Sequence, residues 1–363
     1  MRLDQGPGHT IREQGFTLVE LMIAIAISAI LLLGVVQVFV ISRHSYHLDN
    51  GLAHAQENAR FAVHTLSEDI RMAGYIGCRA VNVANILNNQ TNWMFDFDTP
   101  LQGWDGSKMS SFPSEFASKA VAGTDAIVVL RGGNTQYQIT QVNGSGALAS
   151  SSFQLSTTAG LSQFDIVMVS DCNQASIFQI TNTKPSTNNT VVHQTGTGTP
   201  GNCTNNMGSP VPTTGCTNTS GTNYAYGLSA GMLKLVATAY YIGKSTSGTG
   251  NALYRLSMDK GKAGNPEELA EGVEDMQILY GVDTNGDGLA NQYITADKVS
   301  AITDGFKKVV SVRLGLLVDT TTDVLKAATT KTFNLPGKTI TDTDKKLHFP
   351  IVTTIKLRNR GVM

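Results

Sequence analysis

One acidic residue, Glu20, lies within a long apolar segment near the N-terminus, residues 16–41. A carboxylate inside such a segment costs several kcal/mol unless a cation lies beside it. Cleavage of the chain between Gly15 and Phe16 would create that cation, because the new α-amino group would precede Glu20 by four residues, one helical turn away on the same face. These residues therefore predict a processing site whose product pairs an ammonium group with a carboxylate.

The same apolar segment is long enough to cross a membrane as a helix. At about 1.5 Å per residue, residues 16–41 exceed the hydrocarbon core of a bilayer, which is about 30 Å thick. A cleaved secretory signal is disfavoured because residues 38–43 contain no small-residue cleavage site. A lipidated N-terminus would need a cysteine beside the segment, and the first cysteine is Cys78. A plain anchor stays open but leaves Glu20 unexplained.

The stretch GFTLVEL at residues 15–21 resembles the prepilin signature of type IV pilins and of type II secretion pseudopilins. The resemblance implies that a membrane peptidase removes a leader, residues 1–15, by cutting between Gly15 and Phe16, and that Phe16 becomes N-methylated. It also implies that Glu20 pairs with the N-terminus of a neighbouring subunit during filament growth. Residues 16–41 are then the transmembrane segment of a membrane-inserted precursor.

Beyond the apolar segment, apolar residues continue at steps of three and four as far as Met72. This spacing predicts an amphipathic continuation of the helix over residues 42–75. The remainder, residues 76–363, is predicted to be a β-rich head. We therefore expect an α+β fold of the pilin type, in which a long N-terminal helix, half membrane-spanning and half amphipathic, packs on the head.

Runs rich in β-branched and aromatic residues predict the strands of the head. They cover residues 126–130, 136–142, 165–170, 177–181, 233–242, 253–258, 276–282, 309–318 and 351–357. A short helix is expected at residues 265–269, where Asn265 and Pro266 precede two acids. A Thr/Asn-rich insertion at about residues 182–224 is expected to form a surface loop too polar to contribute to the core.

Composition excludes several classes of function. The chain has 363 residues with 27 basic and 28 acidic side chains, so its formal charge of −1 gives no electrostatic reason to expect a nucleic-acid partner. The pattern G-x-S-x-G at residues 227–231 precedes a predicted strand, whereas a hydrolase nucleophile elbow follows one. We therefore expect no enzymatic activity and no required cofactor.

Segments of the head look like the PilW class of minor pilins: AGYIGC at residues 73–78, LAEGVE at 269–274, YGVD at 280–283 and LRNR at 357–360. The resemblance implies a low-copy minor pilin in a tip or initiation complex that primes pilus assembly, with roles in twitching motility and cell adhesion. J-type pseudopilins of type II secretion share the Glu-Gly-Val and Arg-Asn features and remain an alternative. A pilus-associated adhesin that binds through the Thr/Asn-rich insertion is another.

The partners and the location also follow from the resemblance. The implied partners are other minor pilins, the major pilin, the prepilin peptidase and the inner-membrane assembly platform. The implied location is the bacterial inner membrane, crossed once with the head in the periplasm, and then the pilus at the cell surface.

A periplasmic head would have its four cysteines oxidised. Three pairings are possible. Cys203 and Cys216 lie within the polar insertion and would close a short loop, while Cys78 follows the helix and Cys172 follows a strand, so that their bond would tie helix to sheet. We predict the disulfides Cys78–Cys172 and Cys203–Cys216. Zinc is disfavoured at the cysteines because no Cys-x-x-Cys pair or nearby histidine accompanies them.

Asp283, Asn285 and Asp287 match the first half of an EF-hand calcium loop, D-x-N-x-D-G. The twelfth position of the loop holds Ile294 in place of the glutamate that supplies two ligands, although Asn291 at the ninth position could contribute one. Calcium binding at these residues and a tight turn built from the same residue types both remain open.

Overall fold

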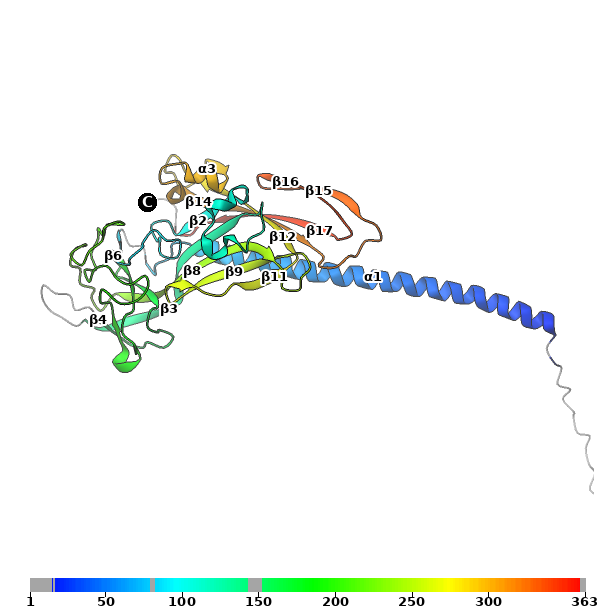
Figure 1. Cartoon of the computed structure of the whole chain (residues 1–363), viewed down its shortest axis with the longest axis horizontal. Coiled ribbons are helices and arrows are strands. Elements are labelled where there is room, and N and C mark those ends of the chain that lie inside the picture. The colour runs from blue at the N-terminus through cyan, green and yellow to red at the C-terminus, as the bar shows by residue number, and fades with distance from the viewer. Residues whose placement is uncertain (1–14, 16, 79–81, 143–151, 360–363) are drawn as a thin grey trace, which may run out of the picture. The chain divides into compact units, whose positions relative to one another are not determined.

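The computed structural model describes residues 15, 17–78, 82–142 and 152–359. The chain divides into two compact units, Met1–Gly51 and Leu52–Met363. Helix α1, Leu18–Met72, is continuous through both of them, so its last turns belong to the second unit, the head. Figure 1 shows α1 in blue at the start of the chain and the strands that follow it. The predicted helix, which was expected to continue to about Met72, is confirmed.

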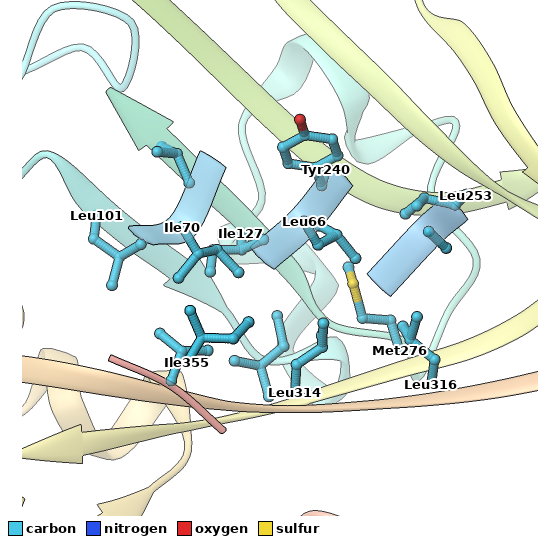
Figure 2. Close-up of a cluster of buried hydrophobic side chains, with 14 of the residues drawn as sticks. Leu66, Ile70, Leu101, Ile127, Tyr240, Leu253, Met276, Leu314, Leu316 and Ile355 are labelled. Carbon is cyan, nitrogen blue, oxygen red and sulfur yellow. The ribbon is translucent and has the colours of Figure 1, made fainter. Parts of the chain in front are cut away.

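Within the head, α1 lies between two sheets. Its buried side chains recur at steps of four and three residues: Ala55, Ala59, Ala62, Leu66 and Ile70. Figure 2 shows Leu66 and Ile70 between side chains of the larger sheet, such as Tyr240, and side chains of the smaller sheet, such as Leu314. The alanines let the helix backbone approach the strands closely, while Leu66 and Ile70 fill the space between the sheets.

The larger sheet contains eleven strands among the described residues. Its main path runs in the order β1-β6-β5-β8-β3-β4-β7. Off this path, β2 pairs with β3, β9 pairs with β8, and β10 and β11 pair with β9. Strands β1 and β6 are parallel, and the other pairs are antiparallel. The strands are β1 Asn82–Asn85, β2 Leu101–Trp104, β3 Ala126–Val142, β4 Ser152–Leu155, β5 Ile166–Ser170, β6 Gln174–Gln179, β7 Thr190–Val192, β8 Gly231–Lys244, β9 Asn251–Asp259, β10 Lys262–Ala263 and β11 Glu267–Glu271.

The smaller sheet is antiparallel in the order β13-β12-β14-β17, and β15 and β16 form a separate two-stranded sheet. These strands are β12 Val273–Val282, β13 Gln292–Ile294, β14 Val309–Asp319, β15 Thr329–Leu335, β16 Lys338–Asp344 and β17 His348–Lys356. Short helical segments connect the strands: η1 Gly106–Ser111, α2 Ser114–Ala117, η2 Thr187–Asn189, α3 Ala296–Ser300 and η3 Gly305–Lys308. The α+β fold class predicted from the sequence is confirmed.

All nine predicted strand runs overlap observed strands, and the first two are parts of a single strand, β3. The helix predicted at residues 265–269 is wrong, because residues 267–271 form β11. There the open edge of β9 pairs with the segment, and Arg255 Nη2 of β9 lies 2.7 Å from Glu267 Oε2. The tertiary pairing thus overrides a local capping pattern.

The interpretation of residues 182–224 as a loop outside the core is also wrong in part. Its strand β7 pairs with β4, and the side chains of Val191, His193 and Met207 are buried. The polar side chains complete the backbone pairing: the amide of Asn202 accepts a hydrogen bond from Gln179 N at 2.8 Å and donates one to Gln179 O at 2.8 Å. Asn202 therefore continues the pairing of β6 in place of a further strand.

Candidate functional site

The predicted processing site lies at the start of α1. Gly15 is exposed, whereas Phe16 and residues 1–14 lie outside the described residues, so cleavage and methylation stay predictions. The backbone N–H of Glu20 donates to Thr17 Oγ1 at 3.2 Å, and Leu21 N–H donates to Thr17 O at 3.1 Å. Thr17 thus caps the helix by satisfying a backbone donor of its first turn.

This cap reveals a role for Glu20 that our sequence analysis missed. An acid in the first turn is stabilised by the positive end of the helix dipole. The sequence does contain the signal for this role, because Thr17 and Glu20 have the Thr-x-x-Glu spacing of a capping box. Because the cap bond uses the backbone N–H of Glu20, its side-chain carboxylate can still accept a bond from an ammonium group.

The first half of α1 exposes a continuous apolar surface. Side chains all along residues 18–41 are exposed, including Leu18, Ile30 and Val38. Among the described residues, α1 is the one helix long and apolar enough to cross a membrane. An apolar surface of this extent is stable in lipid or against other apolar helices.

The end of α1 is held by polar contacts within the head. Asp69 Oδ1 accepts a hydrogen bond from Arg131 Nε at 2.9 Å, and Asp69 Oδ2 accepts one from Tyr240 Oη at 2.6 Å. Burial, followed by the charge of Asp69, raises the pKa of Tyr240, so the phenol stays a donor. This network joins α1 to β3 and β8 of the larger sheet.

Two segments quoted above for their resemblance meet at the end of this helix. Asn359 Nδ2 donates to Met72 O at 3.3 Å and to Ala73 O at 3.2 Å, and Arg358 N–H donates to Arg71 O at 3.1 Å. Arg358 and Asn359 therefore form a C-terminal clasp, which donates hydrogen bonds to carbonyl groups that the end of the helix leaves unpaired.

The Glu-Gly-Val segment at residues 271–273 also contacts α1. Asn58 Nδ2 donates to Glu271 O at 3.0 Å. Gly272 has φ +77°, and a Cβ at this position would lie 2.9 Å from Asp319 O, so the turn between β11 and β12 requires glycine. Asp319 N–H in turn donates to Gly272 O at 2.8 Å. The segment thus places the strand turn directly against the helix.

Both disulfides have the predicted pairing. Cys78 bonds to Cys172 with Cα atoms 5.2 Å apart, and Cys203 bonds to Cys216 with Cα atoms 5.8 Å apart. The first bond joins the segment after α1 to the turn between β5 and β6, and the second closes the polar insertion on itself. The pairing was open among three alternatives, and the positions of the cysteines relative to helix, strand and insertion selected the observed one.

The loop that resembles an EF-hand brings Asp283, Asn285 and Asp287 together in one turn. Asp283 accepts backbone N–H groups of Asn285, Gly286 and Gly288, and Asn285 Nδ2 donates to Asp287 Oδ2 at 3.0 Å. Partial desolvation alone would raise the pKa of Asp283, but the hydrogen bonds from the backbone lower it. The oxygens that would bind calcium therefore already stabilise a tight turn.

The last two calcium positions differ from an EF-hand. Asn291 Oδ1 accepts from Thr284 N at 2.7 Å, and Ile294 lies in β13 opposite Tyr280. A cation at this loop would have to replace several of these hydrogen bonds. Calcium binding therefore remains a prediction.

The class of protein follows from the N-terminus and the fold. Residues 11–36 match the family model described as the prokaryotic N-terminal methylation motif. A methylation motif, the long apolar helix that follows it and a β-rich head fit a pilin-like protein that is anchored in the inner membrane.

Residues 239–359 match the family described as Type IV Pilus-assembly protein W, PilW. The match includes the Glu-Gly-Val turn, the smaller sheet and the C-terminal clasp. Together the two matches support a type IV pilus minor pilin of the PilW class, which confirms the resemblance predicted from the sequence. No curated protein and no solved structure matches the chain.

Proposed function

We propose that this chain is a non-enzymatic minor pilin, built at low copy into a tip or initiation complex that primes type IV pilus assembly. The observation that carries the proposal is the exposed apolar surface of α1 over residues 18–41, which directly follows the methylation motif and contains one charged residue, Glu20. A helix with such a surface can leave the lipid and enter a filament only if other apolar helices replace its contacts with lipid.

Apolar contacts alone give little preference for a neighbouring helix over lipid, because lipid tails are equally apolar. A charge pair supplies the preference, since an ammonium and a carboxylate attract strongly where water is excluded. We assign these charges to the N-methylated amino group of Phe16 and to Glu20 of an adjoining subunit. The prepilin peptidase creates the first by cutting after Gly15, and the inner-membrane platform and the other pilins provide the assembly partners.

The head supports a terminal position in the filament. It comprises the whole of the second unit, Leu52–Met363, and bulk of this kind limits lateral packing along a filament but not at its end. Its two disulfides suit an oxidising compartment such as the periplasm, and later the cell surface.

The test combines processing with a charge variant. Mass spectrometry of the membrane-derived protein should find an N-terminus at methylated Phe16. Glu20→Gln keeps the size of the side chain and the backbone cap and removes the charge. Processing should therefore persist while the number of surface pili falls at least about tenfold, the effect of losing about 1.4 kcal/mol at one assembly step. The matched control is Glu57→Gln, an exposed acid on the same helix, which should leave piliation unchanged.

The experiment also measures the copy number of this chain in pili and its position along the filament. Quantitative proteomics of sheared pili should find far less of this chain than of the major pilin, and immunogold labelling should mark filament ends. An unprocessed N-terminus, or normal piliation by Glu20→Gln, would refute the assembly role. Normal pili combined with lost protein secretion in a deletion strain would instead assign the chain to a secretion system.

A further inference from the structure

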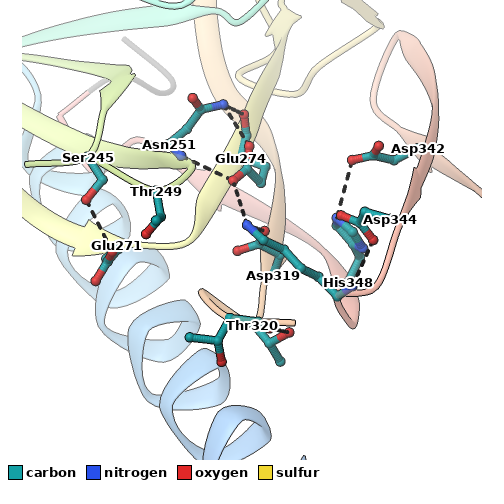
Figure 3. Close-up of polar contacts among 12 residues, drawn as sticks. Ser245, Thr249, Asn251, Glu271, Glu274, Asp319, Thr320, Asp342, Asp344 and His348 are labelled. Carbon is teal, nitrogen blue, oxygen red and sulfur yellow. Dashed lines mark hydrogen bonds and ion pairs between the residues drawn. The ribbon is translucent and has the colours of Figure 1, made fainter. Parts of the chain in front are cut away.

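We propose that Asp342, Asp344 and His348 form a binding site for a divalent transition-metal ion of the zinc type. Asp342 and Asp344 are alternate residues of β16, so their side chains project from the same face of the strand. The chain then turns back within three residues and begins β17 at His348. Figure 3 shows the imidazole of His348 between the two carboxylates. This proposal is independent of the assembly role proposed above.

The buried nitrogen Nε2 of His348 faces the two carboxylates at ion-pair distance but makes no hydrogen bond with either. The imidazole of His348 is 2% exposed, and its Nε2 atom makes no hydrogen bond among the described residues. This nitrogen lies 3.5 Å from Asp342 Oδ2 and 3.4 Å from Asp344 Oδ2, and the three ligand atoms lie within 4.8 Å of one another. A buried polar atom without a hydrogen bond costs free energy that a metal ion would offset.

The distances fit tetrahedral coordination. Zinc binds histidine nitrogen and carboxylate oxygen at about 2.0–2.2 Å, which places two ligand atoms of a tetrahedron about 3.3–3.5 Å apart. Both nitrogen-to-oxygen distances agree with this separation, and they are longer than those of good hydrogen bonds. The side chain of Asp342 is 46% exposed and that of Asp344 is 29% exposed, so water can occupy the fourth position.

Backbone groups orient both carboxylates toward the histidine. Thr343 N–H donates to Asp342 Oδ1 at 2.7 Å, and Lys346 N–H donates to Asp344 Oδ1 at 2.9 Å. Each carboxylate therefore has one oxygen held by the backbone and the other, Oδ2, directed at His348. Supporting hydrogen bonds of this kind fix the orientation of metal ligands before the ion binds.

The charge balance and the donor set favour a zinc-type ion. The two carboxylates carry the charge that a divalent cation neutralises. The turn contains two lysines, Lys345 and Lys346, and the Nζ of Lys346 donates to Asp319 Oδ2 at 2.5 Å. Lys331 lies opposite Asp342 across the β15–β16 pair, and Lys345 directly follows Asp344 in the turn. A nitrogen ligand favours zinc over calcium, which prefers oxygen ligands throughout.

Binding would join the hairpin to the smaller sheet. Two ligands belong to β16 and the third to β17, which pairs with β14. The residues of β15 and β16 are almost all exposed or half-buried, so the hairpin has little apolar burial to fix it. A bound ion would therefore order this hairpin against the sheet.

The experiment uses the full chain in detergent, purified without a histidine tag and treated with a chelator. Titration with ZnCl₂ by calorimetry should show one saturable site per chain, and zinc should raise the melting temperature. Tetrahedral Co²⁺ should give visible absorption bands as a second readout. Asp342→Asn, at a half-buried position whose side chain is 46% exposed, and His348→Gln should each weaken zinc binding at least tenfold.

The matched control is Asp283→Asn, an acid of the EF-hand-like loop, which should bind zinc as the wild type does. Equal zinc affinity in wild type and Asp342→Asn would overturn the proposal. So would the absence of a stoichiometric zinc site in the wild type, or tighter binding of CaCl₂ than of ZnCl₂ in Asp287→Ala, in which the EF-hand-like loop no longer contributes calcium binding.

Discussion

Replacing Asp69 by alanine should destabilise the head by about 3 kcal/mol. The substitution removes the acceptor of both Arg131 Nε and Tyr240 Oη, and the side chains of Asp69 and Arg131 are only 12% and 17% exposed. Breaking a buried ion pair from one side costs about 3–5 kcal/mol. The lower end applies because Arg131 keeps hydrogen bonds to Gly132 O and Asn134 Oδ1, both at 3.2 Å.

Urea unfolding of the full chain in detergent measures this effect, with fluorescence of Trp93 and Trp104 reporting on the head. The matched control is Glu68→Ala, the preceding residue of the helix, whose exposed carboxylate lies 3.9 Å from His64 and should contribute less than about 1 kcal/mol. A loss below about 1 kcal/mol in Asp69→Ala would refute the reasoning that this network holds α1 on the sheet.

Three further predictions concern other parts of the head. Burial lowers the pKa of His193 from 6.5 to about 4. The free energy of unfolding is therefore highest above pH 6.5 and falls by about 3 kcal/mol as the pH drops to 4. The difference in unfolding free energy between wild type and His193→Phe should change by that amount between pH 6.5 and pH 4. Replacing Cys203 and Cys216 by serine should cost about 3 kcal/mol, measured by thermal unfolding, because the bond closes a short loop. Calorimetric titration with CaCl₂ should give heat that Asp287→Ala abolishes, and equal heat from both proteins would exclude calcium at that loop.

The parts of the fold that were predictable share strong local patterns. The helix could be predicted to Met72 because Ala59, Ala62 and Leu66 repeat at helical spacing, and each of them is buried. The strands β12 and β14 could be predicted because their β-branched runs are buried along nearly their whole length. Hydrophobic burial dominates the free energy of these elements, so the pattern of apolar residues reports it directly.

The β15–β16 hairpin could not be predicted from the same signal. Its strands contain mostly Thr, Lys and Asp side chains that are exposed or half-buried. Hydroxyl groups pair across it instead, with Thr330 Oγ1 2.9 Å from Thr343 Oγ1 and Thr332 Oγ1 3.1 Å from Thr341 Oγ1. Cross-strand pairs depend on register, which the sequence does not display until the two strands are known to be partners.

The same distinction separates the sites that sequence revealed from those it did not. Glu20 and the loop at Asp283 were visible because their chemistry depends on residues one helical turn or one tight turn away. The cluster at His348 was not visible, because its nitrogen meets Asp342 and Asp344 only after β16 reverses into β17 and buries the imidazole. A site formed by a strand reversal therefore depends on the geometry of the turn between β16 and β17, which the sequence alone does not display.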